Sequence, residues 1–194
     1  MVYVILADGF EDIEALGTID ILRRCGLQVQ TLSITGKRVV TSAHDLVVKA
    51  DSLFRKNHLD YCDAIVLPGG SKGAETLLGN GILRLTLQHQ FAKGALIAAI
   101  CAAPMVLDAA GILKGKHATI YPTMRTYLSD AIYHDNAYVV EHDNVITGSG
   151  PAATPHFAFA IAKRLVKTPA AVDEVARQMG YSPGSDNFAN YLKF

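Results

Sequence analysis

The stretch ALIAAICAAPMVLDAAG, residues 95–111, decides the fold. Its first part, Ala95–Ile100, is apolar throughout and predicts a buried β-strand. Cys101 follows at once, and a helix of small residues is expected from Ala102 to Ala110, ended by Gly111. Small side chains are what a tight reversal from strand to helix requires. The pattern therefore predicts a nucleophile elbow, with the Cys101 sulfur at the end of the sheet.

Cys101 has two interpretations on this stretch alone. The positive end of the following helix would favour thiolate over thiol, which predicts a reactive cysteine. A free cysteine is also often a small buried hydrophobic residue with no chemistry of its own. The rest of the chain has to decide between them.

Apolar runs and helical patterns alternate along the whole chain. Strands are expected at Val2–Ala7, Val29–Ile34, Ala64–Leu67, 117–120, 138–141 and 145–147, with a possible hairpin in 37–48. Helices are expected at Glu11–Cys25, 72–78, 81–91, 122–128, from Pro151 and from Pro169. Apolar strands separated by helices form a parallel sheet covered by helices on both faces. We therefore expect an α/β fold in a single domain over residues 1–194.

The composition argues against several classes of protein. Lys and Arg number 18, as do Asp and Glu, so the net charge is zero and nothing indicates binding to nucleic acid. No apolar run is long enough to span a membrane. Three widely spaced cysteines do not suggest a disulfide scaffold and suit a reducing, cytoplasmic location. No Cys or His spacing is typical of zinc, so neither a metal nor another cofactor is expected.

Three loops carry unusual chemistry where predicted strands end: residues 7–14, 68–73 and 101–104. In parallel α/β folds, sites lie at the carboxyl ends of the strands. Gly69 and Gly70 could present main-chain N–H groups as an oxyanion hole beside a nucleophile, or could simply form a tight turn.

Acidic residues crowd the first turn of the first predicted helix. Glu11 and Asp12 are expected to complement the helix dipole. The buried face of this helix is expected to consist of Ile13, Leu16, Ile19 and Leu22. Glu14 adjoins that face, where burial would raise its pKa, and it could exchange a proton with the sulfur.

A cysteine nucleophile often needs a histidine base, and the chain has seven histidines. They are His44, His58, His89, His117, His134, His142 and His156. Only His156 follows a strand at the expected end of the sheet, and no histidine adjoins Cys101 in the sequence. None is therefore a strong candidate for the base. Tyr121, at the end of the 117–120 strand, is the favoured local partner, with a half-buried aromatic role as an equal alternative. Ser149 is interpreted as an N-cap-region serine.

Six segments together resemble the ThiJ/PfpI superfamily, and specifically its DJ-1 branch. They are ILADGFEDIEAL (5–16), DILRRCGLQV (20–29), DAIVLPGG (63–70), ALIAAICAAP (95–104), TGSGPA (147–152) and FAFAIA (157–162). The resemblance implies a flavodoxin-like sandwich and a homodimer. It implies that Cys101 is reactive and easily oxidised, and that Glu14 hydrogen-bonds the sulfur as a protonated acid. Gly69, Gly70 and the main chain of Ala102 would then line the anion pocket.

Three positions set this chain apart from parts of the superfamily. Tyr121 stands where many relatives have histidine, and Ser149 where some have arginine. The protease-like branch has a histidine directly after the cysteine. Ala102 occupies that position here, which argues against peptidase activity.

The resemblance implies one of two functions. The first is a cofactor-free glyoxalase or deglycase that acts on small dicarbonyls such as methylglyoxal. Cys101 would form a hemithioacetal, Gly70 and Ala102 would hold the oxyanion, and Glu14 would carry the proton. The alternative is a peroxide-responsive redox sensor or protective, chaperone-like protein that uses oxidation of Cys101. The expected partners are therefore a small carbonyl compound or peroxide and a second copy of the chain.

Overall fold

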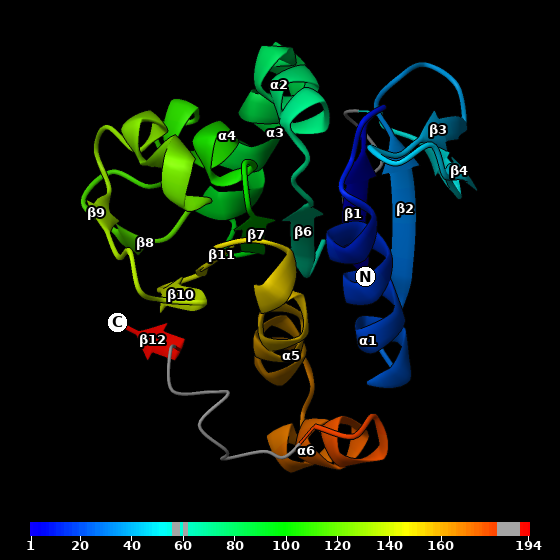
Figure 1. Cartoon of the computed structure of the whole chain (residues 1–194), viewed down its shortest axis with the longest axis vertical. Coiled ribbons are helices and arrows are strands. Elements are labelled where there is room, and N and C mark those ends of the chain that lie inside the picture. The colour runs from blue at the N-terminus through cyan, green and yellow to red at the C-terminus, as the bar shows by residue number, and fades with distance from the viewer. Residues whose placement is uncertain (56–58, 60–61, 182–190) are drawn as a thin grey trace.

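A computed structural model describes residues 1–55, 59, 62–181 and 191–194. Its main sheet has eight strands in the order β12-β10-β11-β7-β6-β1-β2-β5 (Figure 1). The strands are β1 (Val2–Leu6), β2 (Val29–Ser33), β5 (Ser52–Leu53), β6 (Ala64–Leu67), β7 (Leu96–Ile100), β10 (Val139–His142), β11 (Val145–Gly148) and β12 (Tyr191–Lys193). Every neighbouring pair is parallel except β10 and β11, which form an antiparallel hairpin.

Helices cover both faces of this sheet (Figure 1). One layer holds α1 (Thr18–Arg24) and α5 (Thr154–Leu165), with α6 (Pro169–Gln178) packed on α5. The other layer holds α2 (Ser71–Gly79), α3 (Gly81–Ala92) and α4 (Pro104–Ala109). The expected α/β fold with a mainly parallel sheet is confirmed.

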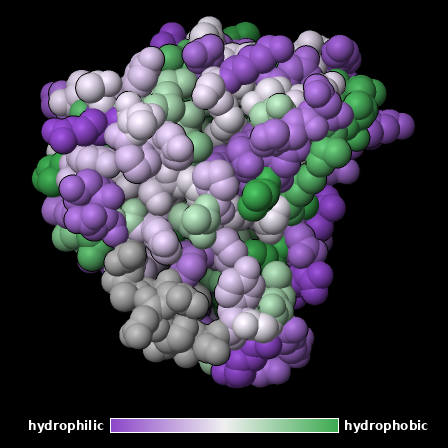
Figure 2. Space-filling model, viewed as in Figure 1, coloured by the Kyte–Doolittle hydropathy of each residue, from purple (hydrophilic) through white to green (hydrophobic). Residues whose placement is uncertain are grey.

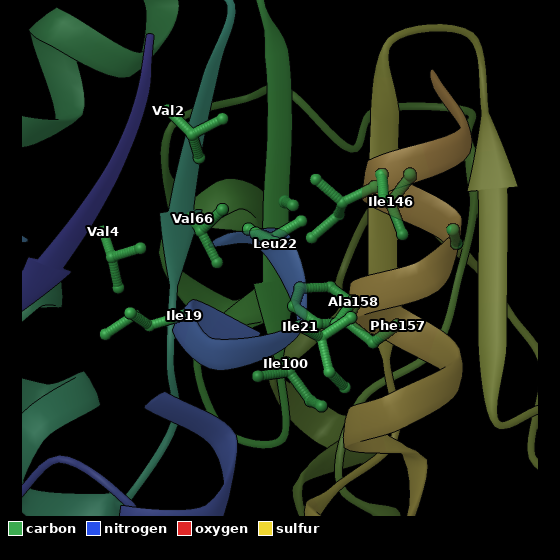
Figure 3. Packing of buried hydrophobic residues seen from close by; sticks show 14 of the residues in the cluster. Val2, Val4, Ile19, Ile21, Leu22, Val66, Ile100, Ile146, Phe157 and Ala158 are labelled. Carbon is green, nitrogen blue, oxygen red and sulfur yellow. The ribbon is translucent and has the colours of Figure 1, made fainter. Parts of the chain in front are cut away.

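The central strands are buried on both faces, which explains why they are apolar throughout. Along β1, Val2, Val4 and Leu6 belong to the core shared with α1 and α5. Tyr3 and Ile5 belong to the opposite core beneath α2, α3 and α4. Figure 3 shows the first core, where the side chains of β1 lie among those of α1 and α5.

The first predicted helix differs from expectation. It begins as a π-helical turn (η1, Ile13–Gly17) and only then continues as α1. A π turn widens the helix and changes which side chains face inward. Ile13 and Leu16, expected in the core, are 59% and 37% exposed, whereas Glu14 is only 1% exposed.

Other differences lie at the edges of the fold. The 37–48 segment forms a separate hairpin, β3 (Val39–Thr41) with β4 (Val47–Lys49). The 117–120 strand shortens to β8 (His117–Ala118), which pairs with β9 (Ile132–Tyr133) outside the main sheet. The helix expected at 122–128 is a 3-10 helix throughout, η3 (Pro122–Tyr127), and the one expected from Pro151 begins with a 3-10 turn, η4 (Pro151–Ala153), before α5.

The two edge strands of the main sheet, β5 and β12, carry no pattern that predicted them. β12 pairs in parallel with β10, where Tyr191 lies opposite Val139, although the two residues are 52 positions apart in the chain. Tyr191 in β12 donates its hydroxyl to the buried Glu141 carboxylate of β10, which also pairs with Arg164. None of the described helices is long and apolar enough to cross a membrane.

Candidate active site at the ends of three strands

The three chemically unusual loops meet in space. They leave the carboxyl ends of β1, β6 and β7, which are consecutive neighbours in the sheet. Because these strands are parallel, their ends lie at one edge, and Glu14, the Gly69-Gly70 turn and Cys101 come together there. The arrangement expected from the sequence is therefore present.

Cys101 occupies the predicted elbow. Its φ of 61° lies in the left-handed region, which a side chain other than glycine rarely adopts. Its main-chain N–H donates to Gly148 O at 2.9 Å, and its carbonyl accepts the N–H of Tyr121 at 2.9 Å. The reversal occupies residues 101–103, so the helix expected from Ala102 starts at Pro104 as α4. The main chain of the elbow is thus bonded to two neighbouring segments.

The two glycines after β6 are needed for space. A Cβ on Gly69 would lie 2.6 Å from both Cys101 Cβ and Glu14 Oε2. A Cβ on Gly70, whose φ is +88°, would lie 2.3 Å from the carbonyl oxygen of Gly9. Both positions exclude a side chain, so the main chain of this turn can pack directly against the cysteine and the glutamate.

Glu14 reaches the site because the π turn directs its side chain inward. Its Oε2 accepts the Gly69 N–H at 2.8 Å. Its Oε1 is buried and makes no well-aligned hydrogen bond within the described residues. The Cys101 thiol lowers the pKa of this carboxyl, and the carboxyl raises the pKa of the thiol.

The proton affinities of this pair differ from those of free side chains. Burial raises the pKa of Glu14 to about 7, helped by the negative charge of Glu11, while the Cys101 thiol and the Gly69 N–H oppose the rise. Burial and then the charge of Glu14 raise the pKa of Cys101 to about 12. The N–H groups of Gly70 and Ala102 act in the opposite direction on the thiol.

Two sequence expectations need correction here. A standing Cys101 thiolate was expected from the helix end, but burial and an ionised Glu14 favour the thiol. The contribution of the Glu14 charge to the raised pKa of Cys101 disappears when Glu14 is protonated. In addition, the Gly69 N–H is already taken by Glu14, so the N–H groups directed at the sulfur are those of Gly70 and Ala102.

Tyr121 and Ser149 border the site through their main chains. Besides its hydrogen bond to Cys101, Tyr121 has a 41% exposed side chain, and its ring lies 3.2 Å from where a Cβ on Gly150 would stand. Ser149 donates its N–H to the carbonyl of Tyr138 at 3.0 Å. Neither contact gives these side chains a chemical role.

Several histidines are engaged elsewhere. His117 and His134 share a hydrogen bond of 2.7 Å, and both rings stack on Phe194. The ring of His156 lies 5.5 Å from that of Tyr138, centroid to centroid. His58 lies outside the described residues.

Glu11, Asp12 and His44 form the one cluster within the described residues that could hold a metal ion. Each offers a ligating atom within 4.8 Å of the others. The Asp12 carboxylate, however, already binds the Ser42 hydroxyl and His44 Nδ1, the latter at 2.5 Å. These groups satisfy one another, and cofactor-free chemistry stays a prediction.

Comparison with known proteins places the chain among relatives of the same fold. Residues 1–164 match the DJ-1/PfpI family. Protein dj-1beta of Drosophila melanogaster is 37% identical over 163 residues, covering 84% of this chain and 87% of the relative. The crystal structure of Drosophila melanogaster DJ-1beta superposes with a TM-score of 0.88 at 35% identity, covering 93% of this chain and 97% of that one.

A further solved structure is that of oxidized DJ-1 from Toxoplasma gondii. It has a TM-score of 0.84 and 32% identity, and covers 93% of this chain and 97% of that one. The family match spans most of the chain, and it includes the β1, β6 and β7 loops that build the site. The chain therefore belongs to the DJ-1/PfpI family.

Proposed function

We propose that this protein is a cofactor-free glyoxalase or deglycase that acts on small dicarbonyls, with methylglyoxal as the test substrate. The observation that carries the proposal is the pair of partly buried Cys101 and buried Glu14, in which the carboxyl has a pKa of about 7. Such a group both accepts and donates a proton near neutral pH, as general acid–base catalysis requires.

The first step is addition of sulfur to the aldehyde carbon. Glu14, as carboxylate, takes the thiol proton as the C–S bond forms, and then gives it to the new alkoxide. The N–H groups of Gly70 and Ala102 stabilise the negative oxygen on the way. This order of steps does not require Cys101 to be ionised before the substrate binds, which agrees with the raised pKa of its thiol.

The second step moves hydrogen between the two substrate carbons. Glu14 removes the proton from the former aldehyde carbon, giving an enediolate, and returns it to the neighbouring carbon, while the hydroxyl proton passes from the oxygen of the first carbon to that of the second. The product is a lactoyl thioester on Cys101. Water then hydrolyses the thioester, releasing lactate and restoring the thiol, so that one methylglyoxal and one water give one lactate.

Peroxide sensing is the second candidate function. Two peroxide molecules would oxidise the Cys101 thiol to a sulfinic acid, with release of two waters. The buried Glu14 Oε1 is available to hydrogen-bond a sulfinate oxygen. The solved Toxoplasma gondii relative is described as oxidized, which favours keeping this candidate.

The deciding experiment is incubation of pure protein with methylglyoxal in the absence of glutathione, followed by measurement of lactate. The variants are Cys101→Ser and Glu14→Gln, with Cys25→Ser as the matched control for loss of a thiol outside the site. We expect lactate from the wild type and from Cys25→Ser, and none from the two site variants.

Absence of lactate above the buffer blank in all proteins would reject the enzyme for this substrate. Mass spectrometry after peroxide treatment then tests the second candidate. Selective addition of two oxygen atoms to Cys101, with Cys25 and Cys62 unmodified, would support the sensor.

We also propose that a second copy of the chain covers an exposed apolar patch. The patch consists of Ile13, Leu16, Val39, Leu46 and Val47. Asp12 and Ser42 hydrogen-bond to each other and so join the η1 end of the patch to the β3–β4 end. Figure 2 shows apolar surface on the side where Figure 1 places the β3–β4 hairpin.

We also propose a cytoplasmic location for the protein, because its three free cysteines suit a reducing compartment.

A further inference from the structure

Glu11 has contacts that the expected helix-dipole role does not explain. Its main-chain N–H donates to the carbonyl oxygen of Gly69 at 3.0 Å. Its Oε2 accepts the main-chain N–H of Glu14 at 2.7 Å. The Gly69 N–H in turn donates to Glu14 Oε2 at 2.8 Å. These three hydrogen bonds form a closed ring that joins the β1 loop to the β6 loop.

The ring determines how Glu14 can carry a proton. Its Oε2 is occupied as the acceptor of the Gly69 N–H, so the proton of the neutral acid belongs on Oε1. The place of a Gly69 Cβ is 2.6 Å from both Glu14 Oε2 and Cys101 Cβ. A carboxyl locked to Gly69 is therefore also locked beside the cysteine.

We propose that Glu11 is a positioning residue, which anchors Glu14 to the Gly69 turn through the hydrogen-bond ring. Its negative charge also strengthens proton binding by Glu14. This role rests on the proposed function for its purpose, because a proton carrier must be both fixed and near neutrality. The ring and the charge are separate contributions, and different substitutions remove them.

The charges around Glu11 support an effect of this kind. Glu14 lies on the same segment as Glu11, and Cys101 faces Glu14 from the elbow after β7. Two carboxylates this close disfavour joint ionisation, so the charge of Glu11 raises the pKa of Glu14. On the other side, Asp12 and His44 approach Glu11. Protonated His44, whose own pKa is raised chiefly by its hydrogen bond to Asp12, offsets part of the charge of Glu11.

The test uses the full chain and needs no substrate. Glu11→Gln keeps a side-chain oxygen for the Glu14 N–H but removes the charge, whereas Glu11→Ala removes both. Asp12→Asn is the matched control, because it neutralises a neighbouring carboxylate outside the ring. Carbon-13 NMR follows titration of the Glu14 carboxyl, whose signal is identified by its loss in Glu14→Gln. Alkylation by iodoacetamide reports on Cys101.

We expect Glu11→Gln to lower the titration midpoint of Glu14 by roughly 0.5–1 pH unit, and Asp12→Asn to lower it by less than about half as much. We expect alkylation of Cys101 at neutral pH to be about threefold faster or more in Glu11→Ala than in Glu11→Gln, since only alanine breaks the ring and lets the Glu14 charge, which raises the pKa of the thiol, move away from the sulfur.

Equal alkylation rates of Cys101 in Glu11→Ala and Glu11→Gln would overturn the positioning role, and a Glu14 midpoint that stays within about 0.2 pH unit of the wild type in Glu11→Gln would overturn the effect of the charge. An equal shift in Asp12→Asn would do the same, because any carboxylate at this helix end would then suffice. If Glu11→Ala does not fold, the comparison of Glu11→Gln with Asp12→Asn still decides. A shifted midpoint without lactate formation would reject the proposed function and keep the role of Glu11.

Discussion

Glu14→Gln should change how stability depends on pH. Glu14 is 1% exposed, and burial raises its pKa from 4.5 to about 7, so the folded chain binds this proton more tightly than the unfolded chain. The resulting stabilisation is complete below the unfolded pKa and is lost as the pH rises through about 7. Glutamine cannot ionise, so the stability of the variant should not fall in this way as the pH rises.

The size of the effect follows from the shift. Each pKa unit corresponds to about 1.4 kcal/mol, so the free energy of unfolding of Glu14→Gln minus that of the wild type should rise by about 3 kcal/mol between pH 4.5 and 8. For a chain of this length, that is a relative change in Tm of roughly 6–12 °C. The Cys101 thiol stays neutral over this range, because its pKa is about 12.

The assay is urea unfolding of both proteins at several pH values, with thermal unfolding as a second probe. Glu75→Gln, which removes an exposed glutamate on α2, is the control for loss of charge alone. A stability difference between Glu14→Gln and the wild type that is constant from pH 4.5 to 8, within about 0.5 kcal/mol, would refute the account of Glu14 as a buried acid that is neutral below pH 7.

Three further predictions concern other parts of the fold. Gly69→Ala should destabilise by about 1–3 kcal/mol or more, whereas Gly79→Ala, with open space around its Cβ, should be neutral or slightly stabilising in urea unfolding; equal effects would contradict the packing argument. Tyr191→Phe should cost about 1.5–3 kcal/mol and speed hydrogen exchange in β12, because a buried carboxylate loses a donor; unchanged exchange would count against this anchor. Val47→Asp should shift a dimer towards monomer in analytical ultracentrifugation, while Leu85→Asp on α3 should not; a monomeric wild type would remove the proposed interface.

The sequence predicted the centre of the fold well for a physical reason. Strands buried on both faces must be apolar at every position, so β1, β6 and β7 stand out in the sequence. The site followed from the same logic, since Cys101 and Gly70 lie just beyond β7 and β6, and Glu14 lies in the first turn of the helix that follows β1. At the elbow and at the glycine turn, close packing leaves room for few other residue types.

The failures also have physical causes. Periodicity assumes a regular α-helix, and the π turn at Ile13–Gly17 shifts the inward face from Ile13 to Glu14. Edge strands such as β12 form through pairing with a distant partner, and three residues carry too little pattern to reveal this. Glu11 was expected only to complement a helix dipole, because a hydrogen bond to Gly69 across the sheet edge leaves no trace in local sequence.

The positive φ of Cys101 has a consequence for how the chain can change over time. A non-glycine residue in this conformation costs about 1–2 kcal/mol, which glycine would recover. Selection for thermodynamic stability alone would therefore favour glycine at position 101. A cysteine at this position is a trade-off in which folding free energy is given up so that a sulfur atom lies at the end of the sheet beside Glu14.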